Sequence, residues 1–265
     1  MYSPFQLVKK YLHYYFHASN GKGHGVHSPF VFDFIKNVLN DKSQDDFLEE
    51  IESLRKELLA STKIIDVADF GAGSSVIKTA KRPVNKIAAS SLKHVKYAQL
   101  LYRIVHHYKP GTIIELGTSF GISTSYMAHG NKLANIYTME GAPTIAAIAR
   151  DNFEKLGLTN IQLWEGDFGA TLAPLLSGIK KIDLAFIDGN HRKEPTLEYF
   201  SQLINSVNDT GIIIFDDIHW SEGMEEAWAT IQQHPGVTLS IDLFFIGLVF
   251  INPDFKVKQE YQIRF

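Results

Sequence analysis

Residues Thr112–Thr124 constrain the fold of this chain more than any other segment, because they have the pattern of a buried strand, a glycine turn and a helix start. Thr112–Leu116 is short, apolar and β-branched, as expected of a strand covered on both faces. Gly117 and Gly121 lack a Cβ, so a ligand can lie against the backbone there. A glycine-rich turn that leads into a helix is a general feature of nucleotide sites. The segment therefore favours an α/β nucleotide-binding fold.

The end of the next predicted strand strengthens this interpretation. Asn135–Glu140 ends on an acid that follows the turn by roughly 20 residues, where α/β nucleotide folds place a ribose-binding carboxylate. Its two oxygens can accept hydrogen bonds from both ribose hydroxyls. The turn lacks the middle glycine of G-x-G-x-x-G. The pattern at this point fits both nicotinamide-dependent and S-adenosylmethionine-dependent enzymes.

The segment Glu115-Leu-Gly-Thr-Ser-Phe-Gly121, together with Glu140, resembles class I S-adenosylmethionine-dependent methyltransferases. It is most similar to the branch that includes catechol O-methyltransferase and caffeoyl-coenzyme A O-methyltransferase. The resemblance covers about Leu92–Phe265. It implies a doubly wound, mostly parallel, Rossmann-like sheet of seven strands whose last strand is antiparallel.

Strands and helices alternate after the glycine turn, which is the order expected of an α/β protein. The last two predicted strands are separated by too few residues for a helical crossover, so this pair must be antiparallel. The predicted strands are Thr112–Leu116, Asn135–Glu140, Ile161–Glu165, Lys181–Asp188, Gly211–Asp216, Val237–Leu243 and Gly247–Asn252.

The first third of the chain differs in character, and we expect residues 1–90 to form a helical cap that covers the substrate. Residues 91–265 would form the S-adenosylmethionine-binding domain. Ser28 is expected to cap a helix that extends to about Leu39, and a second helix is predicted over Asp45–Ala60. Lys63–Pro83 is predicted to be irregular. It contains a second glycine turn at residues 71–73, but no strand-ending acid follows near residue 90, so the turn at Gly117 is favoured.

The resemblance to methyltransferases implies the cofactor contacts. Glu115 would anchor the loop and the methionine end of the cofactor, Asp167 would accept a hydrogen bond from the adenine amine, and Phe168 would contact the ring. For Asp167, an ordinary turn with a solvent-facing carboxylate is the alternative. The full predicted set is Glu115, Gly117, Thr118, Ser119, Gly121, Ser123, Glu140, Gly141, Asp167, Phe168 and Asp188.

Acidic residues at two further strand ends predict a metal site. Asp188 follows the fourth strand, and Asp216 and Asp217 end the fifth. Adjacent strands lie about 4.8 Å apart, and ligands bind at the carboxyl ends of such strands. Three carboxylates suit Mg²⁺. Asp217 stands where the family has Asn, and a cluster of loop caps without an ion is the alternative.

His191 lies three residues after Asp188 and is the predicted base, with Asp188 as the second catalytic residue. In catechol O-methyltransferases this offset carries a lysine that is held to act as base. A neutral imidazole can remove a hydroxyl proton near neutral pH. A histidine that only orders the loop is the alternative. His219 is a weaker candidate, because Trp220 beside it suggests packing.

Net charge, cysteine content and the length of apolar runs exclude several classes of function. The formal net charge of −3 with mixed signs gives no basic stripe for nucleic acid, and the absence of cysteine excludes thiolate chemistry. No apolar run reaches about 18 residues, so no membrane partner is expected, and a cytoplasmic location is the default. We predict transfer of a methyl group from S-adenosylmethionine to an oxygen of a small molecule, assisted by Mg²⁺. A nicotinamide-dependent oxidoreductase and a non-catalytic S-adenosylmethionine-binding module are the alternatives.

Overall fold

The computed structural model describes residues 1–42, 47–69 and 78–265. The predicted glycine turn at residues 71–73 lies outside the described residues. The chain divides into two compact units: Met1–Asp41 with Leu176–Phe265 form the first, and Lys42–Leu175 form the second. Residues 1–90 are thus distributed over both units. Their predicted role in covering a substrate stays a prediction.

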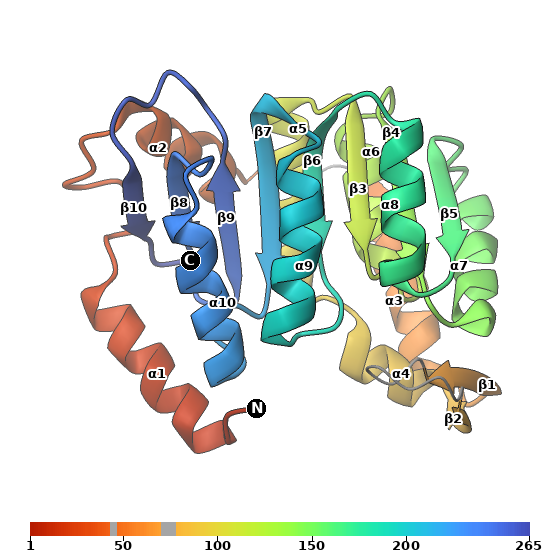
Figure 1. The fold of residues 1–265 in the computed structure, drawn as a ribbon. Coiled ribbons are helices and arrows are strands. Elements are labelled where there is room, and N and C mark those ends of the chain that lie inside the picture. Colours follow the sequence, from red (N-terminus) through yellow and green to blue (C-terminus); the bar gives the residue numbers. More distant parts are fainter. Residues whose placement is uncertain (43–46, 70–77) are drawn as a thin grey trace. The chain divides into compact units, whose positions relative to one another are not determined.

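The second unit contains three parallel strands in the order β3-β4-β5 (Figure 1). They are β3 (Thr112–Leu116), β4 (Asn135–Glu140) and β5 (Ile161–Glu165), with the bounds that the sequence predicts. β3 is almost wholly buried, as its continuous apolar pattern indicates. The parallel register brings the carboxyl ends of β3 and β4 together.

Helices α5 (Val95–Tyr108), α6 (Ile122–Gly130) and α7 (Pro143–Lys155) surround these strands. α5 packs on α6, and α7 packs on β4 and β5. α6 begins directly after the glycine turn, and eight of its nine residues are buried. A helix buried on all sides has no polar face to mark it in the sequence.

The earlier part of the second unit corrects one prediction. The described parts of residues 63–83 are not irregular: β1 (Ile64–Asp69) and β2 (Lys78–Pro83) pair antiparallel, and α4 (Val84–Ser91) follows them. The pair was missed because β2 contains four charged or hydroxyl residues and one proline at its end, with little apolar alternation. β1 packs against α7. α3 (Phe47–Ala60) confirms the second predicted helix.

The first unit contains five strands in the order β10-β8-β9-β7-β6. β6 and β7 are parallel, and β9 runs against both β7 and β8 (Figure 1). The seven predicted strands are therefore present as β3 to β9, and the predicted α/β class with one reversed strand is confirmed. β10 was not predicted. The strands of this unit are β6 (Ile182–Ile187), β7 (Val207–Asp216), β8 (Leu239–Asp242), β9 (Ile246–Phe250) and β10 (Gln259–Gln262).

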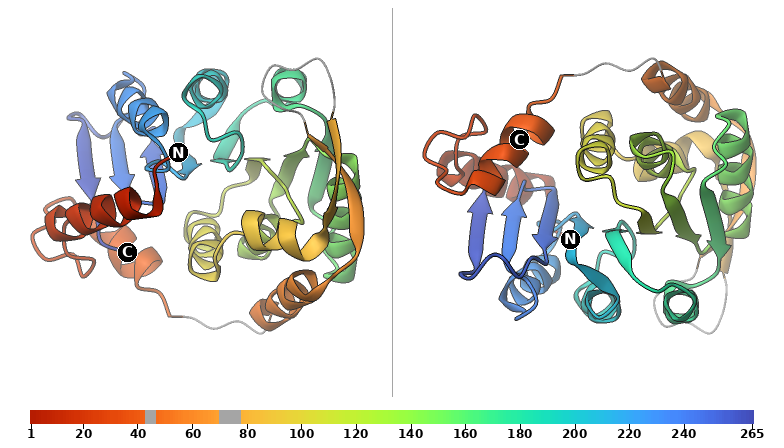
Figure 2. Two further views of the ribbon diagram at one scale, coloured as in Figure 1. Left: turned by 90° about the horizontal axis from the view of Figure 1, so that it is seen from below. Right: turned by 90° about the horizontal axis from the view of Figure 1, so that it is seen from above.

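Helices cover both faces of these five strands, with α1 and α2 on one face and α10 on the other (Figure 2). The Ser28 hydroxyl accepts a hydrogen bond from the amide of Val31 and caps α2, as predicted, and a π-helical turn continues to Leu39. α1 was not predicted as a helix. The helices of this unit are α1 (Pro4–His17), α2 (Pro29–Phe34), η1 (Ile35–Leu39), α9 (Lys193–Ile204) and α10 (Glu222–Gln233); α8 (Phe168–Gly178) crosses the division.

Candidate active site

Glu115 lies at the end of β3 and is fully buried. One carboxylate oxygen accepts a hydrogen bond from the Ser123 hydroxyl at 2.6 Å, and the other accepts from the hydroxyls of Thr138 (2.6 Å) and Thr124. Burial raises the pKa of Glu115 to about 7, although the three hydroxyls act to lower it. Glu115 therefore joins β3, β4 and the start of α6, which supports its predicted part in anchoring the loop. Contact with the cofactor stays a prediction.

The turn after β3 has an unusual backbone. Gly117, Ser119 and Gly121 have φ values of 108°, 48° and 81°. Such values are rare for residues with a Cβ. The amides of Gly117 and Thr118 both donate to the carbonyl oxygen of Met139, at 3.1 and 3.0 Å. The turn is thereby held against the end of β4.

Helix α7 supports the turn from the other direction. A Cβ on Gly121 would overlap with the ring of Phe153, so glycine is needed there for packing as well as for its conformation. The Asn152 side-chain amide donates to the carbonyl oxygen of Phe120 at 2.9 Å. The sequence predicts that Gly121 lacks a Cβ so that a ligand can approach the backbone. The structure adds close packing against Phe153 as a second reason for glycine.

Glu140 ends β4 beside the glycine turn, as the spacing predicts. Its carboxylate accepts hydrogen bonds from the backbone amides of Ser119 and Ala142, each at 2.9 Å. Burial raises the pKa of Glu140, although the amides of Ala142, Ser119 and Gly141 act to lower it. An ionised carboxylate offers about four acceptor positions. Acceptor capacity is therefore left for ribose hydroxyls.

Asp167 and Phe168 lie at the corner after β5. The amide of Gly166 donates to the carbonyl oxygen of Glu140 at 3.0 Å, which fixes this corner beside β4. Asp167 is exposed, and its carboxylate accepts from the amide of Gly169 at 2.9 Å. Phe168 is half-buried as the first residue of α8. Asp167 thus caps the helix, and its predicted adenine contact stays a prediction.

In the first unit, the loops after β6 and β7 bring three predicted residues together. Asp188, His191 and Asp216 each place one potential ligand atom within 4.8 Å of the others. Nε2 of His191 lies 3.9 Å from Oδ1 of Asp188. Asp216 is buried, whereas Asp188 and His191 are partly exposed. The parallel register of β6 and β7 produces this convergence.

Asp217 does not belong to this group of three. Its backbone has a φ of 53°, and its amide donates to the carbonyl oxygen of Phe245 at 2.7 Å. Asp is among the few residues that tolerate this conformation. The arrangement therefore has two carboxylates and one imidazole, where the sequence predicts three carboxylates.

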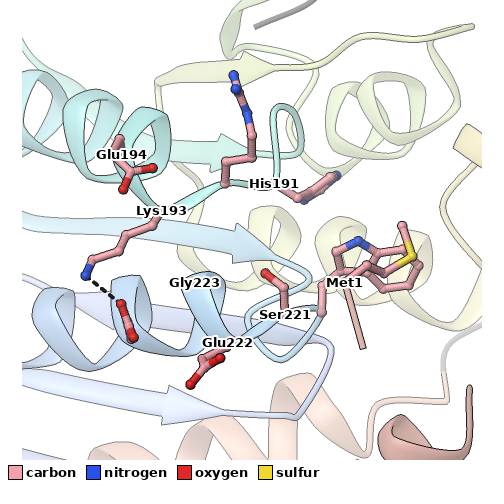
Figure 3. Close-up of a pocket in the computed structure, with 10 residues that line it drawn as sticks. Met1, His191, Lys193, Glu194, Ser221, Glu222 and Gly223 are labelled. Atoms are coloured by element: carbon pink, nitrogen blue, oxygen red, sulfur yellow. Dashed lines mark hydrogen bonds and ion pairs between the residues drawn. The ribbon is translucent and has the colours of Figure 1, made fainter. Parts of the chain in front are cut away.

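A pocket of about 540 Å³ lies beside His191 (Figure 3). Ligand sites of small molecules typically have volumes of about 300–1,000 Å³. Met1 and Trp220 give it apolar surface, and the Lys193 ammonium bonds Glu226 at 2.6 Å on its wall. Its lining residues, all in the first unit, are Met1, His191, Arg192, Lys193, Glu194, Trp220, Ser221, Glu222, Gly223 and Glu226.

Glu225 on α10 holds the N-terminal segment at this pocket. It accepts hydrogen bonds from the Tyr2 hydroxyl at 2.7 Å and from the Lys10 ammonium at 2.8 Å. The amide of Tyr2 donates to the carbonyl oxygen of Trp220 at 3.0 Å. These bonds place Met1 in the pocket wall. No sequence pattern signals this contact, because its partners are more than 200 residues apart.

His219 completes the same network. Its two ring nitrogens lie 2.9 Å from carboxylate oxygens of Glu225 and Asp242. Burial acts to lower the pKa of His219, but hydrogen bonds to the two carboxylates outweigh it and raise the pKa. The ring also stacks on Phe244. His219 thus fixes the loop that carries Trp220, which supports the packing role over that of a base.

Thr138 is a site residue that the sequence analysis missed. Its hydroxyl bonds both Glu115 and the Thr118 hydroxyl, at 2.6 and 2.5 Å. It is a polar residue within the buried strand β4. A buried hydroxyl needs a hydrogen-bond partner. A threonine within a buried strand is therefore the sequence feature that could have indicated this role.

Comparison with known proteins agrees with this geometry. Residues 114–218 match the model of a family described as a methyltransferase domain. A catechol O-methyltransferase from Niastella koreensis is 32% identical over 126 residues, which cover 46% of this chain and 55% of that protein. The chain therefore spans about half the length of this curated relative.

Solved structures show the same fold at low sequence identity. An O-methyltransferase from Bacillus cereus in complex with SAH has a TM-score of 0.58 at 20% identity, covering 83% of this chain and 97% of that one. An SAH-bound methyltransferase from Podospora anserina has a TM-score of 0.59 at 18% identity, covering 84% and 96%. The matched segment begins within β3 and ends just after β7, so it contains the glycine turn, Glu140 and the three grouped residues. Residues 114–218 thus match a methyltransferase-domain family, and the chain shares the Rossmann-like fold of these solved enzymes.

Proposed function

We propose that the protein is an S-adenosylmethionine-dependent methyltransferase that methylates an oxygen of a small molecule. The observation that carries the proposal is the hydrogen bond from the Ser119 amide to Glu140, which joins the glycine turn to a carboxylate suited to ribose hydroxyls. The match of residues 114–218 to a methyltransferase domain supports it. So does the catechol O-methyltransferase relative.

The cofactor would bind at the end of β3 and β4. S-adenosylmethionine supplies a methyl group on a sulfonium. The residues proposed to hold it are Gly117, Thr118 and Ser119 in the turn, Glu140 at the ribose, and Asp167 with Phe168 at the adenine. Glu115 would position the turn and not contact the cofactor, because its two carboxylate oxygens already accept hydrogen bonds from three hydroxyls. A rigid site supplies much of the rate by positioning the reactants.

A divalent cation would be held by Asp188 and Asp216. The donor chemistry fits a metal, because two carboxylates so close together repel each other and a cation removes that conflict. Two carboxylates with water in the remaining positions suit a hard divalent ion such as Mg²⁺, and they leave the His191 imidazole outside the proposed ligand set. Such an ion lowers the pKa of a bound hydroxyl and orients it.

His191 would remove the proton of the acceptor hydroxyl. It lines the pocket and is partly exposed, so an acceptor can reach it. The apolar surface of Met1 and Trp220 suits an aromatic or other flat acceptor, and the relative's name points to catechols. S-adenosylmethionine, when bound, would supply the methyl group, and S-adenosylhomocysteine would leave as the carbon–sulfur bond breaks.

Calorimetric titration with S-adenosylhomocysteine tests the cofactor assignment. We expect wild-type binding in the micromolar range and at least about tenfold weaker binding for Glu140→Gln, since a hydrogen bond to a charged group contributes about 1.5–3 kcal/mol. The matched control is Glu165→Gln. Glu165 ends the neighbouring strand in register with Glu140, but it is exposed and pairs with Arg150.

The control should bind like the wild type. Equal affinity in Glu140→Gln and Glu165→Gln would refute the ribose assignment. Binding of NAD⁺ in place of S-adenosylhomocysteine would favour the oxidoreductase alternative.

A further inference from the structure

Helix α1 exposes a row of apolar side chains that the methyltransferase function does not use. The row, called the α1 stripe, has residues spaced by three and four, which places them on one side of the helix. Phe5 and Phe16 are the most exposed, at 81% and 72%. The α1 stripe comprises Phe5, Val8, Leu12, Tyr15 and Phe16.

The α1 stripe is separate from the face that fixes the helix to the protein. Tyr14 and Ala18 pack against Phe244, and the Tyr14 hydroxyl donates to the carbonyl oxygen of Ile263. Lys10 bonds Glu225. The helix is therefore held in place mainly by other residues, and of the stripe residues Tyr15 also contacts Tyr11 and Arg264.

Positive charge borders the stripe on both sides. Lys9 and His13 are exposed on one flank of the helix, and the guanidinium of Arg264 lies 4.9 Å from the ring of Tyr15 on the other. α1 contains no acidic residue, and the first one in the chain is Asp33. The whole chain has a net charge of −3, so this basic character is local to the N-terminal segment.

Two occupants would cover such a stripe: a second copy of the chain or a lipid surface. A stable protein interface uses about 20–30 residues on each side, and a row of five on one helix falls far short. An amphipathic helix with aromatic residues on its apolar face and cations beside it suits the boundary of an anionic bilayer. Tyrosine and phenylalanine are favourable at that depth.

We propose that α1 docks the protein on the surface of anionic membranes, with the α1 stripe in the headgroup region and Lys9 and Arg264 at the lipid phosphates. The helix has 14 residues and would lie in the plane of the bilayer. Among the described residues no helix is long and apolar enough to cross a membrane. The proposal departs from the sequence-based expectation of no membrane partner, which considered spanning segments. It does not depend on the methyltransferase function.

Co-sedimentation of the full chain with vesicles tests the proposal. We expect the wild type to sediment with equimolar phosphatidylcholine and phosphatidylglycerol, and far less with phosphatidylcholine alone. The double variant Phe5→Ser and Phe16→Ser should lose about tenfold or more in affinity, because burying even one phenylalanine is worth that much. The matched control is Leu133→Ser, which changes a side chain that is 90% exposed elsewhere.

A second variant tests the contribution of positive charge to membrane binding. Lys9→Glu should weaken binding to anionic vesicles and leave binding to neutral vesicles unchanged. Three results would overturn the proposal: no sedimentation of the wild type, equal sedimentation of the double serine variant, or a wild-type dimer in analytical ultracentrifugation that the double variant abolishes. The last result would assign the stripe to a second copy of the chain.

Discussion

At the scale of single residues, Glu115 is a fully buried acid whose carboxylate accepts hydrogen bonds from three hydroxyls. Its place before the glycine turn marked it as a site residue. Its three hydroxyl partners come from β4 and α6, and only the folded register β3 to β4 brings Thr138 beside it. A fully buried carboxylate with a pKa of about 7 is the physical result. Residue type and spacing predicted the position, and the tertiary pairing determines the charge state.

The raised pKa of Glu115 predicts a pH-dependent stability. Between its ordinary pKa of 4.5 and the folded value of about 7, the native protein holds a proton that the unfolded chain has released. Stability therefore falls as pH rises through this window. Glu115→Gln carries a permanent neutral side chain, so its free energy of unfolding relative to wild type should rise between about pH 5 and about pH 8, by on the order of 3 kcal/mol.

Urea unfolding at the two pH values measures this change, and the exposed Glu57→Gln is the control. A constant difference between Glu115→Gln and wild type at both pH values would show that Glu115 titrates normally.

At the scale of elements, periodicity predicted the buried strands well and the N-terminal region poorly. β3, β4 and β5 have the predicted bounds, because closely spaced apolar residues between turn residues mark them. α1 was missed because apolar residues lie on two of its sides, one packed and one exposed. β10 is short and half-exposed, so its sequence has no strand signature.

Anchoring of α1 by Glu225 gives a prediction for this element. Glu225→Gln removes the charge that Lys10 and His219 face. We expect trypsin to cut after Lys9 and Lys10 about fivefold faster, as a loss of about 1 kcal/mol in local stability implies. Glu226→Gln on the same helix breaks only an exposed pair with Lys193 and should leave the cleavage rate unchanged. Equal rates in the two variants would show that Glu225 does not hold the helix.

At the scale of the whole molecule, the order of strands and helices predicted the fold class, and strand ends predicted most of the candidate site. Asp217 was expected to be a third carboxylate ligand, but it has a left-handed backbone and lies outside the group of Asp188, His191 and Asp216. Its amide donates to the carbonyl oxygen of Phe245, a contact that no local sequence pattern signals. The pocket wall formed by Met1 likewise depends on contacts between the two ends of the sequence.

Turnover that depends on a methyl acceptor is the most direct measurement of the proposed methyltransferase activity. The wild type, incubated with S-adenosylmethionine, Mg²⁺ and a panel of vicinal aromatic diols, should form S-adenosylhomocysteine at a rate that depends on the diol. Asp188→Asn should lower this rate by about a hundredfold or more, the typical effect of losing one electrostatic group at the reacting centre. Its affinity for S-adenosylhomocysteine should remain within about threefold of wild type, since the proposed cofactor contacts lie mainly at β3 and β4. Cofactor binding with no diol-dependent turnover, or full turnover in Asp188→Asn, would contradict the account.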